Sequence, residues 1–263
     1  SIVIVDFDKN PIYKDTVDFD KETDAQTATE ILQRLIAESI QKSGIPRKKV
    51  LGFGIGSPGR IDIDQGREMY YAEIADMDDF PLKSIIERKF KIPVYINNNS
   101  LVLALSEYRY GEAKGIDSLL AILIRTGMGG SFISGGKIFV NQDKTALELG
   151  HMSVDINGRD CQCGAKGCLE SYLSEGAIIS DLQKYIPVKT VEEIENYLLQ
   201  QEPRVISELE EKGRILARIA RNKIENDQYI SQRNIVKIIA EKYDPLFCGL
   251  GASDLVFDHF FDI

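Results

Sequence analysis

Hydrophobic and polar positions follow two different periods along the first hundred residues, which predicts strands and helices in turn. The short apolar runs Ser1 to Asp6 and Ile12 to Phe19 flank a turn pair at Asn10, so we expect two paired strands. From Thr23 to Ser43 the apolar residues recur every three or four positions, which predicts an amphipathic helix ended by Gly44. The chain therefore opens with strands followed by a helix.

The same alternation continues up to about residue 108, and this order of elements is typical of an α/β lobe. We expect a strand over Val50 to Ile55, a sharp loop over Gly56 to Gly59, extended chain at Ile61 and Asp62, a helix over Asp79 to Phe90, a strand over Val94 to Ile96 and a helix from about Leu101.

The second half of the chain is predicted to begin with strands and to continue mainly as helices, without an internal repeat. We expect a strand over Ser118 to Ile124, a glycine-rich turn over Thr126 to Gly130, a hairpin at Gly135 and Gly136, helices over Leu173 to Tyr185, Val191 to Leu199, Val205 to Ile224 and Ile235 to Tyr243, and a last helix over Leu255 to Phe261.

Composition excludes several classes of protein. The formal net charge of -9 argues against a chain that itself grips nucleic acid, because phosphate neutralisation needs a basic face. The compact basic run Arg47-Lys48-Lys49 follows Pro46, and a solvated turn is its simpler interpretation. No apolar run is long enough to cross a bilayer, and no secretion signal is present at Ser1, so we expect a cytoplasmic protein without a membrane partner.

One short segment concentrates the metal-binding chemistry of the chain. Between residues 146 and 170 lie His151, Cys161, Cys163 and Cys168, which include three of the four cysteines. Three thiolates and an imidazole suit Zn²⁺, and the glycines between the cysteines let the backbone turn tightly. The sequence predicts a structural zinc loop over 151–168, and the alternative is a set of core cysteines or a disulfide. The remaining Cys248 is expected to be a buried small residue.

This segment resembles a known family. Glu148-x-Gly150-His151, followed by the run Cys-x-Cys-Gly-x-x-Gly-Cys-Leu-Glu from Cys161 to Glu170, is similar to the signature of the ROK family of sugar kinases and sugar-responsive transcriptional repressors. The resemblance implies a two-lobed α/β fold of the actin-like or ribonuclease H-like sugar kinase type, with a zinc-binding loop. It also implies that sugar binds between the lobes and that homodimers form.

The resemblance implies which side chains contact the sugar. They are Glu148, His151 and Glu170 together with an Asn-Asp pair that follows a strand, and Ala104, Leu105 and Glu107 set the register of that pair. The pair then falls on Asn98 and Asn99, so an amide stands where the kinases have their catalytic aspartate. Because an amide cannot accept a proton at neutral pH, sugar binding is expected to survive and phosphoryl transfer is not. The segment also reads simply as a polar turn that caps the next helix.

The segments that bind ATP in the kinases of the family differ in this sequence. Arg125 replaces the first glycine of a Gly-Thr-Gly-x-Gly phosphate loop, and the remaining glycines are equally explained by a hairpin. No Asp-x-Gly-Gly-Thr loop precedes Ser1, and the segment from Ala220 to Ile235 is polar where the family has an apolar strand ending in Gly-Gly. ATP and Mg²⁺ are therefore not expected as ligands. These differences fit a sensor that does not bind ATP, and they fit equally a chain that lacks its first segment and an internal stretch. A sheet that opens on its second strand would leave an unpaired edge, which favours the missing segment.

Two functions remain open from the sequence. One is the effector-binding domain of a ROK-type repressor, whose winged helix-turn-helix lies upstream and binds operator DNA, and the other is an ATP-dependent hexose kinase. Asn99 and Arg125 favour the repressor. The predicted domains are a first α/β lobe over 1–108, a second over 109–247 with the zinc loop, and a closing helix over 248–263 that packs back on the first lobe.

Overall fold

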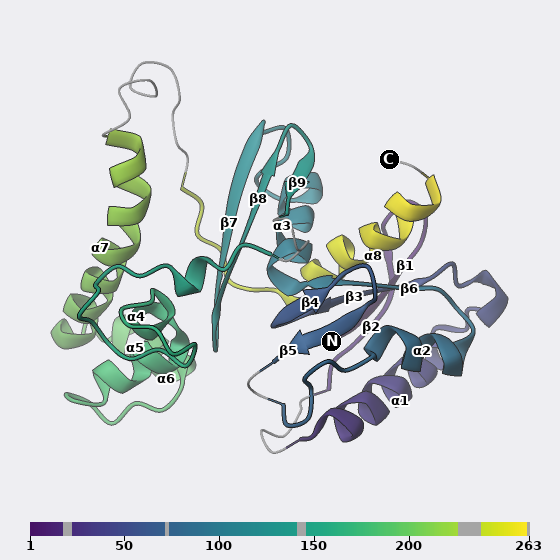
Figure 1. Cartoon of the computed structure of the whole chain (residues 1–263), viewed down its shortest axis with the longest axis horizontal. Helices are drawn as coiled ribbons and strands as arrows, with labels where there is room; N and C mark the ends of the chain where they lie inside the picture. The colour runs from purple at the N-terminus through teal and green to yellow at the C-terminus, as the bar shows by residue number, and fades with distance from the viewer. Residues whose placement is uncertain (18–22, 72–73, 141–145, 226–237, 262–263) are drawn as a thin grey trace. The chain divides into compact units, whose positions relative to one another are not determined.

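The computed structural model describes residues 1–17, 23–71, 74–140, 146–225 and 238–261 as a mixed α/β fold (Figure 1). The chain divides into two compact units. The first unit contains residues 1–123, 130–147 and 242–263, and the second contains residues 124–129 and 148–241. The lobe boundaries given above stay predictions.

The strands of the first unit form short sheets, most of them where the hydrophobic pattern predicts them. β1 (Ile2–Val5) pairs antiparallel with β2 (Pro11–Asp15), β3 (Phe53–Ser57) pairs parallel with β6 (Val94–Asn98), β4 (Arg60–Asp62) pairs antiparallel with β5 (Arg67–Tyr70), and β7 (Ser118–Ile124), β8 (Met128–Ser134) and β9 (Lys137–Phe139) form a sheet in that order.

Two details of these strands correct the sequence analysis. Strand β5 was not predicted, because its sequence Arg-Glu-Met-Tyr is mostly polar and carries a buried glutamate, Glu68. The loop expected over Gly56 to Gly59 is shorter than predicted, since β3 continues through Ser57. The predicted hairpin at Gly135 and Gly136 is confirmed, and both glycines have positive φ angles of 56° and 76°.

The first unit contains five helical segments in the residues that the structure describes, and α1 is capped at both ends. These helices are α1 (Ala25–Ser43), η1 (Arg47–Lys49), α2 (Leu82–Phe90), α3 (Asn99–Tyr110) and α8 (Pro245–Phe261). The Asp24 carboxylate accepts the Thr27 amide at 2.7 Å at the start of α1, and Gly44 ends that helix with a φ of 70°. The run Arg47-Lys48-Lys49 is exposed, as expected of a solvated turn.

The core of the first unit lies on both faces of β3 and β6. Helices α1 and α2 bury Ile36, Ile86 and Phe90 against Val94 and Ile96 on one face, and α3 and α8 cover the other face (Figure 1). Helix α8 approaches β3 so closely that a Cβ atom at Gly54 would lie 1.7 Å from the Ala252 carbonyl oxygen. Helix α8 contacts α3, β1, β3 and β6 of the first unit.

The second unit is mainly helical in the part that the structure describes. Its elements are η2 (Leu149–His151), α4 (Glu170–Leu173), α5 (Glu175–Leu182), α6 (Val191–Leu199) and α7 (Pro203–Glu225). The single helix expected over Leu173 to Tyr185 is interrupted at Ser174, whose hydroxyl accepts the Ala177 amide at 3.3 Å and starts α5.

Two expectations near the end of this unit have different outcomes. A helix over Ile235 to Tyr243 is wrong for Ile238 to Tyr243, which have no regular secondary structure, and residues 235–237 lie outside the described residues. Of the polar segment from Ala220 to Ile235, residues 226–235 also lie outside them. Among the described residues, no helix combines the length and the apolar character that crossing a bilayer requires.

Candidate functional site

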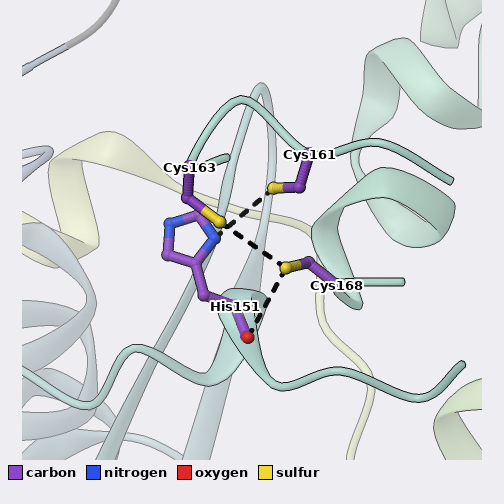
Figure 2. A group of neighbouring side chains, drawn as sticks. All are labelled: His151, Cys161, Cys163 and Cys168. Atoms are coloured by element: carbon purple, nitrogen blue, oxygen red, sulfur yellow. Dashed lines mark hydrogen bonds between the residues drawn. The ribbon is translucent and has the colours of Figure 1, made fainter. Parts of the chain in front are cut away.

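The candidate metal centre is built from one end of η2 and the loop that leads to α4. His151 is the last residue of η2, Cys161 and Cys163 lie on a tight turn, and Cys168 stands two residues before α4. Figure 2 shows the three sulfur atoms and the imidazole of His151 facing one another. One ligand atom from each residue lies within 4.8 Å of the others, so the four side chains could hold a metal ion.

Glycines make this convergence possible. Gly164 and Gly167 have φ angles of 86° and 70°, in the left-handed region that side chains disfavour. A Cβ atom at Gly167 would also lie 1.7 Å from the Asp155 carbonyl oxygen. The turn is closed by the Cys161 amide, which donates to the Ala165 carbonyl at 2.9 Å. The predicted role of the glycines between the cysteines is confirmed.

Two distances within the cluster fit a tetrahedral ion. With metal–sulfur and metal–nitrogen distances of about 2.3 Å and 2.1 Å, tetrahedral geometry puts two ligand atoms about 3.6–3.8 Å apart. The Cys163 and Cys168 sulfurs are 3.6 Å apart, and Cys161 Sγ lies 3.7 Å from Nδ1 of His151. Burial and the neighbouring thiols raise the pKa of Cys168 to about 12, and a divalent cation is the group that would favour its thiolate.

The alternative interpretations of the cysteines do not fit the structure. A disulfide requires sulfur atoms about 2.05 Å apart, and none of the four cysteines, all of which lie in the described part of the chain, forms one. Cys163 is exposed and Cys161 is half-buried, so they are not core residues. Cys248 is buried in α8, as expected of a small packing residue.

The predicted zinc loop over 151–168, here called the metal loop, is followed closely by Glu170. The Glu170 carboxylate contacts the glycine-rich turn between β7 and β8. Glu170 is the first residue of α4, and its Oε2 accepts the Met128 amide at 2.8 Å. A Cβ atom at Gly127 would lie 2.9 Å from the same oxygen, so the glycine leaves room for the carboxylate. Glu148 precedes η2 and is exposed, and its carbonyl accepts the His151 amide at 3.1 Å.

Asn98 and Asn99 have different environments although they are adjacent. The Asn98 side chain accepts the Ser100 amide at 2.9 Å and donates to the Gly59 carbonyl at 2.7 Å, so it caps α3 and holds the loop after β3. Within the described residues the Asn99 side chain makes no hydrogen bond. The cap expected from the sequence is thus confirmed for Asn98.

The predicted sugar contacts are distributed over both units. Asn98 and Asn99 belong to the first unit, while Glu148, His151 and Glu170 belong to the second. Within the second unit the structure brings His151 into the metal cluster and places Glu170 beside Met128. An open hollow of about 640 Å³ in the first unit is lined by residues between Arg47 and Pro93 and includes none of the predicted contacts.

Three charged residues outside the predicted sugar contacts were not found from the sequence. Glu68 is fully buried beside Ser57, and neither of its carboxylate oxygens has a hydrogen-bond partner in the described part of the chain. In the second unit, Arg159 and the buried Asp181 form an ion pair at 2.9 Å. A glutamate inside an otherwise alternating strand is a weak signal, and nothing local in the sequence indicates that Arg159 and Asp181 meet.

With this geometry established, comparison with known proteins identifies the family. The family model described as ROK matches residues 1–241. The chain belongs to the ROK family. The shared fold, the Cys3His cluster and the family match agree, so the resemblance inferred from the sequence is confirmed.

Curated relatives in the ROK family include both repressors and kinases. The chain is 29% identical to the xylose repressor of Caldicellulosiruptor bescii over 90% of its own length and 60% of the repressor. It is 37% identical to the xylose repressor of Bacillus subtilis over 51% of the chain and 34% of the repressor. The glucokinase of Halalkalibacterium halodurans is 35% identical over 59% of the chain and 48% of the kinase. The matches thus span 60% or less of each of these relatives.

Solved ROK structures share the fold. A glucokinase from Streptomyces griseus in complex with glucose and AMPPNP has a TM-score of 0.79 at 22% identity, covering 96% of this chain and 94% of that one. A ROK transcriptional regulator, a homologue of the Escherichia coli MLC protein, has a TM-score of 0.66 at 24% identity and covers 78% and 54%. At these identities the likeness concerns the fold.

Proposed function

We propose that this chain is the sugar-sensing, effector-binding part of a ROK-type transcriptional repressor. The observation that carries the proposal is Asn99 at the position of the kinases' catalytic aspartate. An amide hydrogen-bonds a sugar hydroxyl but cannot take its proton, and loss of a general base costs about 10²–10⁴-fold in rate. The similarity to a xylose repressor over 90% of the chain supports the same conclusion.

In this proposal the sugar hydroxyls are bound by Asn98, Asn99, Glu148, His151 and Glu170. Asn98 keeps one N–H for the sugar, since its other polar groups bond Gly59 and Ser100. Glu170 keeps Oε1, because Oε2 accepts the Met128 amide. Asn99 has no competing hydrogen bond among the described residues, which leaves its whole amide for the ligand.

The proposed metal is Zn²⁺ held by His151, Cys161, Cys163 and Cys168. When bound, it supplies a rigid tetrahedral cross-link, and four protein ligands leave no position for a catalytic water. Its effect on the sugar would be indirect, because His151 and Cys168 would be held as ligands and Cys168 lies two residues before Glu170. ATP and Mg²⁺ are not part of this function.

Sugar and operator DNA are coupled in the proposal through two arrangements of the protein. If sugar binds one arrangement more tightly and DNA the other, each ligand must weaken the other by the same factor. DNA would be bound by a winged helix-turn-helix upstream of this chain in a homodimer. A repressor works in the cytoplasm, where thiols stay reduced, and this agrees with the four cysteines outside disulfides.

The alternative function is an ATP-dependent sugar kinase of the same family. The identity of 35% to a glucokinase over 59% of the chain favours it, and the fold is common to both branches. Asn99 is the residue against it.

Sugar binding is tested by calorimetry of the zinc-loaded chain against D-xylose, D-glucose, other hexoses and pentoses, and disaccharides. We expect one sugar class to bind, and D-xylose is the first to test because two of the relatives are xylose repressors. Zinc-loaded, folded protein that binds none of these sugars would contradict the proposal.

Alanine substitution of the two adjacent asparagines is expected to separate fold from binding. Asn98→Ala removes a helix cap and the hydrogen bond to Gly59, so the free energy of unfolding should fall by about 1–2 kcal/mol. Asn99→Ala should change stability by no more than about 0.5 kcal/mol but weaken sugar binding roughly fivefold, the value of one hydrogen bond. Denaturant unfolding and calorimetry measure both. Equal sugar affinity in wild type and Asn99→Ala would exclude Asn99 from the site.

A further inference from the structure

Arg159 lies in the metal loop over 151–168 and contacts three residues outside the metal cluster, Ser171, Tyr172 and Asp181. Its Nη1 donates to the Ser171 carbonyl at 3.1 Å, and its Nη2 lies 2.9 Å and 3.0 Å from the two carboxylate oxygens of Asp181. Its guanidinium also lies over the ring of Tyr172, 4.6 Å from the centroid. The Arg159 amide donates to the hydroxyl of the same tyrosine at 3.1 Å. Ser171 and Tyr172 directly follow Glu170 in α4.

Asp181 gives Arg159 a fixed partner. Its side chain is 5% exposed, and it also receives hydrogen bonds from Lys184 at 2.7 Å and from Lys212 of α7. Burial raises the pKa of Asp181, but the hydrogen bonds from the three cations outweigh it and hold the pKa at about 2. Lys212 is itself buried and also pairs with Glu208 at 3.0 Å. The carboxylate is therefore anchored to α5 and α7 at neutral pH.

These contacts form a continuous path within the second unit. It runs from α7 and α5 through Asp181 and Arg159 to the first turn of α4, and from Glu170 to the Met128 amide. Helix α4 spans only Glu170–Leu173, so its four residues have little helical stability of their own. The position of the Glu170 carboxylate therefore depends on what holds this turn.

We infer that Arg159 is a positioning residue for Glu170, and that Asp181 fixes Arg159 by tying the metal loop to α5 and α7. The inference deepens the proposed function, on which its prediction for sugar affinity rests. Only a planar fork can bond Ser171 and Asp181 together and still stack on Tyr172. Lysine at 159 would keep the charge without this geometry.

The test that needs no sugar follows the Met128 amide, which Glu170 holds. The chain has four methionines, so selective ¹⁵N-methionine labelling gives separate amide signals for Met69, Met77, Met128 and Met152. In zinc-loaded Arg159→Ala we expect the Met128 signal to shift and its hydrogen exchange to become about tenfold faster, while Met69 and Met77 in the first unit stay unchanged. Arg159→Lys should behave like Arg159→Ala.

The matched control is Arg214→Ala, which removes an exposed arginine of α7 that pairs with Glu211. It should leave all four signals unchanged. Arg159→Ala still leaves Asp181 its two lysine partners, so the unit is expected to fold. A Met128 signal and exchange rate equal to wild type in folded Arg159→Ala would overturn the inference.

Metal content and sugar affinity separate this role from a purely structural one. Arg159→Ala should keep one zinc per chain with an unchanged cobalt-substituted absorption spectrum, while sugar affinity falls about tenfold. Loss of the metal itself would overturn the inference, because Arg159 would then hold the metal loop rather than Glu170. If wild-type protein binds no sugar, the proposed function fails, and the Met128 measurement still decides the role of Arg159.

Discussion

Cys163→Ser is expected to lower zinc content and sugar affinity together. Cys163 is exposed, so the substitution removes a ligand without disturbing the packed core. Losing a direct ligand should weaken zinc binding by more than the roughly 10–100-fold that loss of a supporting group costs. Without the ion, His151 and the segment that leads through Cys168 to Glu170 lose their common anchor, and sugar affinity should fall with metal occupancy.

Metal analysis of the purified protein and calorimetry with the sugar measure both quantities. The matched control is Cys248→Ala, because this cysteine is buried in α8 of the first unit and outside the cluster. It should retain full zinc content and sugar affinity. Full sugar affinity in a zinc-free Cys163→Ser variant would contradict the role given to the metal.

Glu68→Gln is expected to raise the free energy of unfolding, relative to wild type, more at alkaline pH than at acidic pH. Burial raises the pKa of Glu68 from 4.5 to about 7, and the nearby Ser57 hydroxyl offsets only part of this. Between these values the folded state holds a proton that the unfolded state has released, so wild-type stability falls as pH rises from about 4.5 to 7. At about 1.4 kcal/mol per pH unit, the loss between pH 5 and pH 8 is about 2–3 kcal/mol.

Urea unfolding of wild type and Glu68→Gln at pH 5 and pH 8 checks this expectation. The stability of the variant relative to wild type should be higher at pH 8 than at pH 5 by that amount. Glu30→Gln, at an exposed position of α1, is the control and should show no comparable dependence. A Glu68 difference that is the same at both pH values would mean that the carboxylate is not buried as described.

The metal cluster could be predicted from the sequence because its chemistry is local. Cys161, Cys163 and Cys168 are close in the chain, and Gly164 and Gly167 fix the turn between them, so the spacing already implies convergence. The strands β3 and β6 and the helix α1 could also be predicted, because the spacing of their apolar residues follows from which face is buried. Local pattern is sufficient where neighbours in the chain are also neighbours in space.

The interactions that support the site could not be predicted, because they join distant positions. The Asn98 side chain bonds a carbonyl 39 residues away, and Asp181 meets Arg159 and Lys212 across 22 and 31 residues. The burial of Glu68 could not be predicted either, because a glutamate in a strand normally faces solvent. The apolar spacing predicts one helix through Ser174, but the hydrogen bond from the Ala177 amide to the Ser174 hydroxyl starts a new helix there.

The most direct test of the central claim is sugar-dependent ADP formation by the full-length protein with Mg-ATP. The sugars are those of the binding panel, and binding of each is followed in the same samples. We expect that at least one sugar binds and that ADP forms no faster than in the absence of sugar. Sugar-dependent turnover above this background would contradict it, because the protein would then be a kinase whose base is not at Asn99.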